Sequence, residues 1–517
     1  QSEKAKNVLQ QDLFSFLHIS ERNKIHNHPW LVMLNEQRRM HPHISKFSSL
    51  RVYNGLLKDH ESVRSKRNNV ISSEPLPNVS MALIDLHGTF CAAGKNSDNS
   101  RFNILSALIS FGTALKSEIA QQNLKFSPEE KVGIITPYAA QTRLVRAIIQ
   151  DYKEKKETAI SCATVHQFQG SERNVIVFDA VESYPFFKPG WLVSKNENNS
   201  VLRLINVALT RARCKFITLA NTRFWSNKFE DTSNTYYKLL NHIKTENAVI
   251  SAKGNQLTEF IKSLDFGDFI RLYYAPTEAL NSLLSDIKSA KKRIIITLPN
   301  DKLNSEYESK VLKVIREQLD LGIEIFGKAA ETGTFNVEWK KFFSKSKGVP
   351  FPLIAIDDKI TWYGFPLTEL YFEDKNQRFI SYQNPIFRIL GKHTNEMIHS
   401  LCDLDYRIGE NSIKVKLSGN LKASSNMGLS EFVHITQHCK RCGANLNLSK
   451  GRSGKYSLKC SACNSFELLT ENALNQYLDK TNAKCSACGK DIYARVGVKG
   501  LYVRCSNGHF TNIHDLE

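Results

Sequence analysis

No stretch of about 18 uncharged apolar residues occurs in this chain of 517 residues, so the sequence contains no candidate transmembrane helix. The first residues, Gln1 to Gln11, are polar and lack the apolar core of a secretory signal. Low-complexity tracts are absent, and an apolar content of 41% excludes wholesale disorder. These absences predict a cytoplasmic protein, and the length leaves room for roughly three or four domains.

A phosphate-binding loop of the form G-x-x-x-x-G-K-[ST] is missing as well. Gly94-Lys95 has neither the upstream glycine nor the downstream serine or threonine. An acidic DEAx motif for magnesium is also absent. The sequence therefore predicts that this chain cannot hydrolyse a nucleoside triphosphate unaided.

Basic residues are in large excess: 70 Lys+Arg against 51 Asp+Glu give a net charge of +19 and a pI near 9.3. Such an excess favours a polyanion partner, although a lysine-rich solvated surface would give the same balance. The excess is uneven, because residues 411–517 hold 15 Lys+Arg and only 7 Asp+Glu.

Alternating apolar and amphipathic segments predict an α/β domain from Trp30 to about Trp225. The apolar run Val132–Thr136 is followed by an amphipathic helix, and further buried strands are expected at Asn174–Ala180 and Lys215–Ala220. This alternation is typical of a parallel sheet covered by helices.

A second α/β unit is predicted downstream, after a polar, helix-prone connector at residues 226–268. Its expected helices are Glu278–Ala290 and Ser305–Leu321, and its expected strands are Arg293–Thr297, Ile323–Phe326, Leu353–Ile356 and Ile360–Tyr363, the last two paired.

Three short stretches place charge within the first apolar domain: QRRMHP at Gln37–Pro42, CATVHQFQGSE at Cys162–Glu172 and NVALTRAR at Asn206–Arg213. Arginine is always cationic and can bind two phosphate oxygens at once, so two arginines from separate loops could act on one phosphate. The alternative is that these arginines form ordinary surface ion pairs.

Taken together, the order and spacing of these stretches resemble the second RecA-like lobe of superfamily 1B helicases of the nonsense-mediated-decay type, over about residues 8–222. The resemblance implies that Arg39 and Arg211 contact the γ-phosphate of ATP and that Glu172 contacts the ribose. It also implies contacts to the backbone of single-stranded nucleic acid from Thr136, Tyr138, Gln141 and Thr164.

The sequence departs from the helicase pattern in two places. Arg38 replaces the aromatic residue that stacks on adenine, so either a guanidinium plane replaces the stack or nucleotide preference relaxes. His166 stands where the family often has Asp, and we assign it no role. Gly170 is expected to let the backbone approach the nucleotide.

The resemblance also implies a missing half. Residues 1–30 resemble only the last helix of the first helicase lobe, with Leu13–Leu17 as its buried face. ATP and Mg²⁺ would therefore bind only when the first lobe is present, and the chain alone is predicted to be inactive.

Residues 269–425 resemble a phospholipase D-like domain, in which a His nucleophile and a phosphate-binding Lys share one strand. At the matching positions this chain has Pro350 and Pro352, and Phe365 replaces a serine. Proline offers neither a nucleophile nor a charge. The sequence predicts a retained fold with a lost active site; a nuclease site completed by another residue is the alternative.

Seven of the eleven cysteines crowd into the C-terminal region, and four are scattered. Two C-x-x-C pairs, followed 16 or 17 residues later by another pair, predict two four-coordinate structural Zn²⁺ sites rather than disulfides or iron–sulfur clusters. The expected ligands are Cys439, Cys442, Cys460 and Cys463 in residues 431–470, and Cys485, Cys488, Cys505 and His509 in residues 480–517.

These modules resemble the zinc ribbons of bacterial type I topoisomerases, which touch single-stranded DNA. Cations alternate with aromatics in the intervening strands, which suits a single strand: Lys450, Arg452, Lys455 and Tyr456, then Tyr493, Arg495, Lys499, Tyr502 and Arg504. The alternative is that Tyr456, Tyr502 and Phe510 fill the small cores of the ribbons.

The leading hypothesis is thus the C-terminal portion of an ATP-driven 5′-to-3′ helicase or translocase on single-stranded nucleic acid, with DNA slightly favoured over RNA. The combination of domains resembles bacterial antiphage-defence systems at the level of architecture only. Two alternatives are a non-catalytic nucleic-acid-binding protein or scaffold, and a phosphodiesterase.

Overall fold

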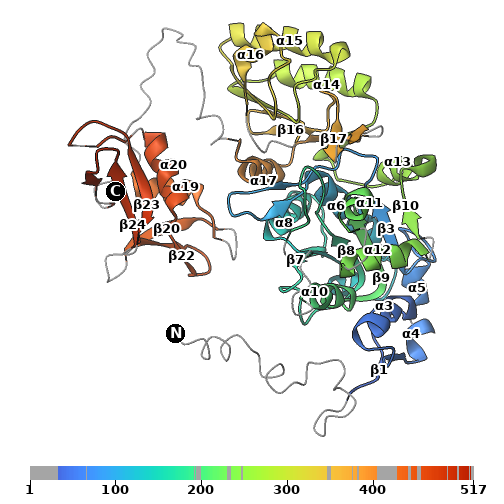
Figure 1. Cartoon of the computed structure of the whole chain (residues 1–517). Coiled ribbons are helices and arrows are strands. Elements are labelled where there is room, and N and C mark those ends of the chain that lie inside the picture. The colour runs from blue at the N-terminus through green and yellow to red at the C-terminus, as the bar shows by residue number, and fades with distance from the viewer. Residues whose placement is uncertain are drawn as a thin grey trace. The chain divides into compact units, whose positions relative to one another are not determined.

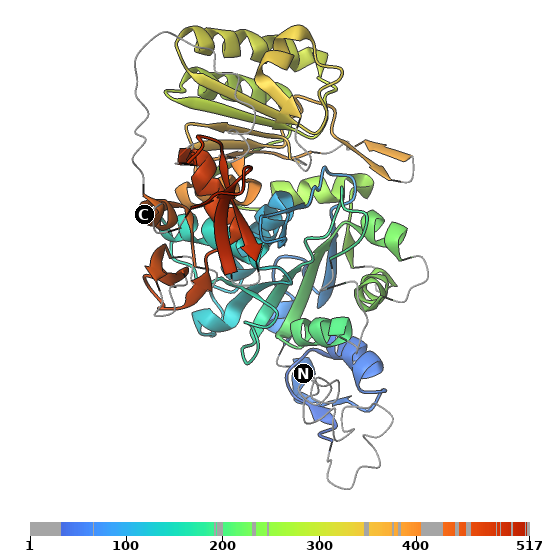
Figure 2. The ribbon, with the colours of Figure 1, turned by 60° about the vertical axis from the view of Figure 1, so that its left-hand side comes forward.

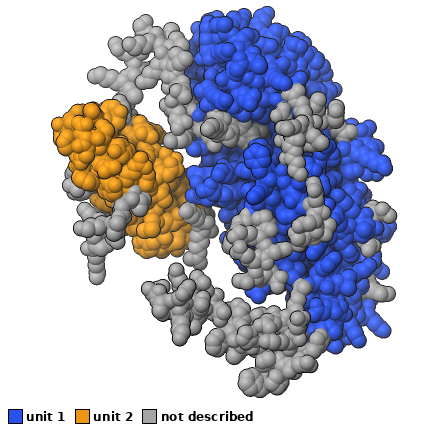
Figure 3. All heavy atoms as spheres, in the orientation of Figure 1, with its two compact units in different colours: residues 1–404 blue, residues 405–517 orange. Residues whose placement is uncertain are grey.

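A computed structural model describes residues 33–65, 67–190, 193, 200–229, 234–245, 248–345, 351–374, 377–380, 384–404, 428–439, 444–450, 456–481, 483–485, 487–497, 500–511 and 513. The chain folds into two compact units, Gln1–Leu404 (unit 1) and Asp405–Glu517 (unit 2) (Figure 3). Residues 1–30, predicted as the end of a first helicase lobe, lie outside the described residues. None of the described helices is long and apolar enough to cross a membrane.

A six-stranded, fully parallel sheet forms the first part of unit 1, which confirms the predicted parallel α/β lobe. Its buried strands have the apolar sequences expected when both faces are covered. In spatial order they are β10 (Val249–Ile250), β3 (Met81–Asp85), β9 (Ala212–Ala220), β8 (Arg173–Asp179), β6 (Val132–Thr136) and β7 (Ser161–Thr164).

Helices cover both faces of this sheet (Figures 1 and 2). From β3 the chain moves one way along the sheet through α6 (Ile104–Ile119) and α8 (Ala139–Lys153); from β8 it moves the other way through α10 (Ser200–Leu209) and α12 (Thr235–Thr245). Because parallel crossovers are right-handed, opposite directions place the two helix pairs on opposite faces.

Shorter elements complete this lobe. They are β1 (Glu36–Gln37), α3 (Pro42–Val52), β2 (Lys58–Asp59), α4 (Ser62–Ser65), α5 (Asn68–Ile71), β4 (Gly94–Lys95), β5 (Arg101–Phe102), α7 (Pro128–Lys131), α11 (Thr222–Lys228), the 3₁₀ turn Lys253–Asn255 and α13 (Gln256–Lys262). The segment 226–268, predicted as a connector, thus supplies the edge strand β10 to the sheet.

A seven-stranded mixed sheet forms the second part of unit 1. Its strands, in spatial order, are β11 (Ile270–Tyr273), β19 (Ile386–Ile389), β16 (Ile360–Tyr363), β15 (Leu353–Ile356), β12 (Arg293–Leu298), β13 (Glu324–Ala329) and β14 (Phe343–Lys345). A separate hairpin joins β17 (Tyr371–Asp374) to β18 (Gln377–Ile380). The predicted pairing of Leu353–Ile356 with Ile360–Tyr363 is confirmed as an antiparallel pair.

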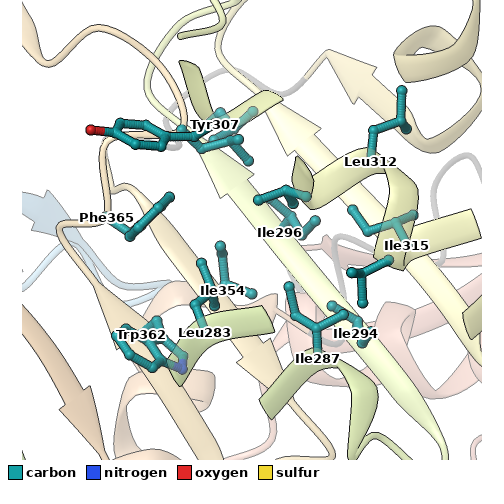
Figure 4. Close-up of a cluster of buried hydrophobic side chains, with 14 of the residues drawn as sticks. Leu283, Ile287, Ile294, Ile296, Tyr307, Leu312, Ile315, Ile354, Trp362 and Phe365 are labelled. Carbon is teal, nitrogen blue, oxygen red and sulfur yellow. The ribbon is translucent and has the colours of Figure 1, made fainter. Parts of the chain in front are cut away.

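Helices of this second part are α14 (Pro276–Lys288), α15 (Ser305–Asp320), α16 (Val337–Phe342) and α17 (Lys392–Cys402). Apolar side chains of α14 and α15 pack on β12, with Leu283, Ile296 and Ile315 among those in the cluster (Figure 4). Asn304 caps α15, and Gly322 follows it with φ +82°, a conformation that glycine adopts readily. We refer to residues 269–404 as the second α/β domain.

In the described residues of unit 2 there are two three-stranded antiparallel sheets and two helices. The first sheet is β20 (Leu446–Lys450), β21 (Tyr456–Cys460) and β22 (Phe466–Leu468); the second is β23 (Ile492–Gly497), β24 (Gly500–Cys505) and β25 (Phe510–Thr511). The helices α19 (Leu429–Thr436) and α20 (Glu471–Thr481) contribute to one apolar cluster that includes residues of both sheets. The two modules therefore share a core.

Candidate functional site

The three charged stretches of the first lobe meet at one cleft of about 920 Å³. Five arginines and two glutamates are among the residues that line it, so the cleft is electropositive. The charged lining residues are Glu36, Arg38, Arg39, Arg67, Glu172, Arg211 and Arg213. An electropositive cleft with several guanidinium groups suits a phosphate-bearing ligand.

Local hydrogen bonds hold the Gln37–Pro42 stretch in place. The side-chain oxygen of Gln37 accepts from the backbone N–H of Arg39 (2.9 Å) and of Met40 (2.8 Å). The N–H of His41 donates to the carbonyl of Arg213 (2.8 Å), at the start of β9. These contacts join the stretch that carries Arg39 to the strand that follows Arg211.

Glu172 lies at the centre of the charged cluster. Its Oε2 is 2.5 Å from Nε of Arg39, and its Oε1 accepts a 2.8 Å hydrogen bond from Nε of Arg213. Arg213 also binds Glu130, with Nη1 2.7 Å from Oε1. Partial burial raises the pKa of Glu172, but the hydrogen bonds from Arg213 and the charges of both arginines lower it below its ordinary value. The carboxylate is therefore charged at neutral pH.

Arg211 faces the same cleft from the end of α10. Its guanidinium donates to the carbonyls of Val207 (3.2 Å) and Ser171 (3.2 Å). Partial burial and the nearby charge of Arg39 lower the pKa of Arg211. Two guanidinium groups that repel each other across a cleft would gain from an anion placed between them.

The structure thus brings together Arg38, Arg39, Glu172 and Arg211. Arg38 is exposed and pairs with Glu36 at 3.0 Å. Gly170 is not among the lining residues, and it forms an exposed turn with φ +89°.

Sequence reasoning missed two arginines of the cleft. Arg213 lies two residues after Arg211, so its place in the same short motif was an available signal. Arg67 comes from a loop before α5, and no motif marks it.

The residues predicted to contact nucleic acid lie elsewhere in the lobe. Thr136 and Thr164 are register neighbours at the carboxyl ends of β6 and β7. Glu172 and Arg211 directly precede β8 and β9, at the amino ends of those strands. In a parallel sheet these are opposite edges, so the two predicted groups of site residues are separated by the length of the sheet.

Side chains of this second group are engaged within the lobe. Thr136 and Gln141 are fully buried. Gln141 accepts from the N–H of Asn103 (2.8 Å) and donates to Asp179 (2.6 Å), and the hydroxyl of Tyr138 donates to Glu182. Their role in binding nucleic acid stays a prediction. In this conformation the side chains of Tyr138 and Gln141 form hydrogen bonds inside the lobe.

In the second α/β domain, the positions predicted to have lost catalytic residues are apolar. Pro352 and Phe365 are buried, and Pro350 lies outside the described residues. Phe351 packs against Phe102 of the first lobe, with ring centroids 5.3 Å apart. The described part of this strand edge is therefore in contact with the first lobe.

Two clusters of potential metal ligands lie in unit 2. In the second module, Cys485, Cys488, Cys505 and His509 place their ligand atoms within 4.8 Å of one another. In the first, Cys439, Cys460 and Cys463 do the same, and Cys442 lies outside the described residues.

The second module also has a two-faced sheet. In the pairing of β23 with β24, Tyr493 lies opposite Arg504 and Arg495 lies opposite Tyr502. Phe510, on β25, also lies opposite Arg504 of β24. The alternating residues of the same strands, such as Ala494 and Val503, are buried in the core. We call the five residues Tyr493, Arg495, Tyr502, Arg504 and Phe510 the ribbon face.

Cations and rings contact one another on the ribbon face. Arg495 lies over Tyr493 at 5.4 Å, and Arg504 lies over Tyr502 at 5.9 Å. Phe510 is 74% exposed, which excludes it from the core. In the first module, by contrast, Tyr456 packs against the shared core.

Comparison with known proteins finds a family model that matches part of the first lobe. The model of a family described as an AAA domain matches residues 10–223. This segment contains every residue that lines the 920 Å³ cleft.

Several curated relatives of this chain are named as helicases. Helicase sen1 of Schizosaccharomyces pombe is 28% identical over 43% of this chain and 13% of its own length. DNA polymerase alpha-associated DNA helicase A of Saccharomyces cerevisiae is 29% identical over 42% of this chain and 30% of its own length. The regulator of nonsense transcripts 1 homolog of Drosophila melanogaster is 29% identical over 44% of this chain and 18% of its own length.

The identity to these three relatives is 28–29%. The chain spans less than a third of the length of each of the three. Among solved structures, NucT from Helicobacter pylori (18% identical) and the phospholipase D family member Nuc from Salmonella typhimurium (14% identical) each match 26% of this chain, and 92% and 93% of their own length. Both have a TM-score of 0.20, which is too low to support a statement about this chain.

Proposed function

We propose that the first lobe is the second motor lobe of an ATP-dependent superfamily 1B-type helicase or translocase that moves 5′-to-3′ on single-stranded nucleic acid, with DNA favoured. The observation that supports this most is the shared cleft of Arg39 and Arg211, two residues 172 positions apart in sequence. Another lobe would supply the phosphate loop and Mg²⁺.

Within this proposal the two arginines stabilise the charge that develops on the γ-phosphate. Glu172 pairs with Arg39 in the present structure, and Arg213, which also binds Glu130, pairs with Glu172 from the other side. Arriving phosphate would compete with Glu172 for Arg39, which would free one carboxylate oxygen for the ribose. The cleft residues bind and orient the nucleotide.

The test measures ATP turnover by the first lobe in the presence of a lobe that supplies a phosphate loop. Arg39→Ala and Arg211→Ala should each reduce ATP turnover by roughly 10³-fold or more, the usual value of an arginine finger. Arg316→Ala is the matched control, because that arginine is a half-exposed partner of Glu338 in the second α/β domain. Retained turnover in both cleft variants would refute the assignment.

We further propose one structural Zn²⁺ in each module of unit 2. Zn–S bonds of about 2.3 Å at tetrahedral angles separate two sulfurs by about 3.8 Å. Cys439 and Cys463 have their sulfurs 3.6 Å apart, as do Cys488 and Cys505. These spacings fit a metal, and four protein ligands per ion leave no position for catalysis. The metal would stabilise modules whose core is small.

The ribbon face is proposed to bind the single strand outside the motor. Guanidinium groups would contact phosphates while the rings stack on bases. Arg504→Ala should weaken binding of a single-stranded oligonucleotide by the chain and reduce its salt dependence. Lys484→Ala is the control, since that lysine is outside the ribbon face and pairs with Asp491. Equal affinity in the two variants would contradict the proposal.

A further inference from the structure

A loop at the carboxyl edge of the parallel sheet has no assigned role. Residues 182–190 follow β8, on the same edge as Thr136 of β6 and Thr164 of β7. Within it, Phe187 is 81% exposed, although large apolar side chains usually find cover.

The beginning and end of this loop are fixed by one buried carboxylate. Glu182 is 1% exposed, and its oxygens accept from the hydroxyl of Tyr138, from the guanidinium of Arg101 and from the N–H of Gly190 (2.9 Å). A side chain at Gly190 would collide with the Tyr138 hydroxyl, so only glycine allows this close approach.

The second α/β domain holds the same loop from another direction. Tyr184 stacks on Phe372 of β17 with ring centroids 5.3 Å apart, and its carbonyl accepts from the N–H of Ala93 (2.8 Å). Contacts at Glu182, Tyr184 and Gly190 therefore hold the loop in place. Because the loop is held, the exposed ring of Phe187 has a defined position on the surface.

Cationic residues belong to the same loop contacts as the exposed ring. The guanidinium of Arg101 lies 4.0 Å over the ring of Phe186 and donates to the carbonyl of Lys188 (3.0 Å), so it contacts the residues on both sides of Phe187 in the sequence. Lys188 itself is exposed. Exposed aromatic rings next to cationic residues are the combination that binds single-stranded nucleic acid, because rings stack on bases and cations contact phosphates.

We propose that Phe187 and Lys188 form a nucleic-acid contact of the motor lobe, in which the Phe187 ring stacks on a base of the single strand and Lys188 binds the adjacent phosphate. Arg101 is a positioning residue, since its guanidinium is already bound to Glu182 and Phe186. A loop ordered before binding loses little entropy when the strand arrives. This inference rests on the proposed nucleic-acid function of the lobe.

The experiment places a fluorophore at the contact. The full chain with Phe187→Trp is titrated with a short single-stranded oligodeoxynucleotide, and tryptophan fluorescence is compared with that of the unsubstituted chain. Stacking of the new indole on a base should quench its emission. Leu321→Trp is the control, because Leu321 is 74% exposed at the end of α15, in the second α/β domain and outside this loop. It should show no added quenching.

Affinity gives a second readout. Stacking of one base is worth roughly 1–3 kcal/mol, so Phe187→Ala should raise the Kd roughly 5-fold or more. Unchanged Kd for Phe187→Ala, together with no added quenching for Phe187→Trp, would overturn the contact while leaving the nucleic-acid function in place. If the unsubstituted chain fails to bind the oligonucleotide even at low salt, the proposed function fails and this contact fails with it.

Discussion

Replacing Asp151 by alanine should separate the stabilities of the first lobe and the second α/β domain. Asp151 lies on α8 and is 3% exposed. Its carboxylate accepts from the backbone N–H of His393 (2.9 Å), the N–H of Thr394 (2.8 Å) and the hydroxyl of Thr394 (2.5 Å), at the first turn of α17. A side chain of one domain therefore caps a helix of the other.

The expected cost follows from these three hydrogen bonds. Loss of a helix N-cap costs about 1 kcal/mol, and each buried donor left without an acceptor costs about 1–3 kcal/mol. Some relaxation will occur, so we expect Asp151→Ala to lower the free energy of unfolding by about 3 kcal/mol. Asp151→Asn keeps one oxygen acceptor but loses the charge, and it should cost roughly half as much.

Tryptophans in both domains allow the two to be followed separately in urea. Trp225 is buried in the first lobe, whereas Trp339 and Trp362 are buried in the second α/β domain. In the unsubstituted chain a single transition is expected; in Asp151→Ala, the domain that contains α17 should unfold at lower urea. Hydrogen exchange of α17 would report the same loss locally.

Glu154→Gln is the matched control, since Glu154 lies on the same helix and contacts His393 at 2.9 Å from a half-exposed position. Exposed ion pairs contribute about 0–1 kcal/mol, so this variant should unfold almost as the unsubstituted chain does. If Asp151→Ala also stays within about 0.5 kcal/mol of the unsubstituted chain, the reasoning from buried capping is wrong.

Three further outcomes are expected. Burial raises the pKa of Asp179 to about 6. Its protonated form therefore contributes stability that is complete below about pH 4 and is lost as the pH rises to about 6. Over that interval the free energy of unfolding, compared with that of the Asp179→Asn variant, should fall by about 3 kcal/mol. Purified chain should contain two Zn²⁺ by elemental analysis, and Cys460→Ser or Cys485→Ser should each lower the content to one. Gly190→Ala should destabilise the first lobe by about 1–3 kcal/mol in thermal unfolding, because the added methyl collides with Tyr138.

Local patterns predicted most of the regular structure. Val132–Thr136 is a strand with the expected bounds, because a buried parallel strand needs a continuous apolar run. The helix predicted at Ser305–Leu321 ends at Asp320, one residue before the predicted end. The cysteine spacing indicated side chains that the structure brings together, Cys439, Cys460 and Cys463 in one module and Cys485, Cys488, Cys505 and His509 in the other, because a C-x-x-C turn fixes two of them locally. That these clusters hold zinc stays a prediction.

Contacts between distant segments were not predictable in the same way. The role of Arg213 depends on Glu130, which lies 83 residues earlier and approaches only in the folded lobe. The burial of Gln141 depends on Asn103 and Asp179, so a polar residue after a strand could not be distinguished from a ligand contact by sequence alone. Pairing over long sequence distances is decided by packing, which a single sequence does not display.

Aromatic side chains form much of the contact between the first lobe and the second α/β domain. Phe351 precedes β15 and packs on Phe102. Gly94, in the same hairpin as Phe102, has no side chain and so leaves room for the ring of Phe351. Pro352 is buried beside it, so a charged side chain at that position would lose its hydration without gaining a partner. The aromatic pair of Phe90 and Phe372, with ring centroids 4.3 Å apart, extends this junction. The second α/β domain is therefore joined to the first lobe by packing of aromatic side chains from both.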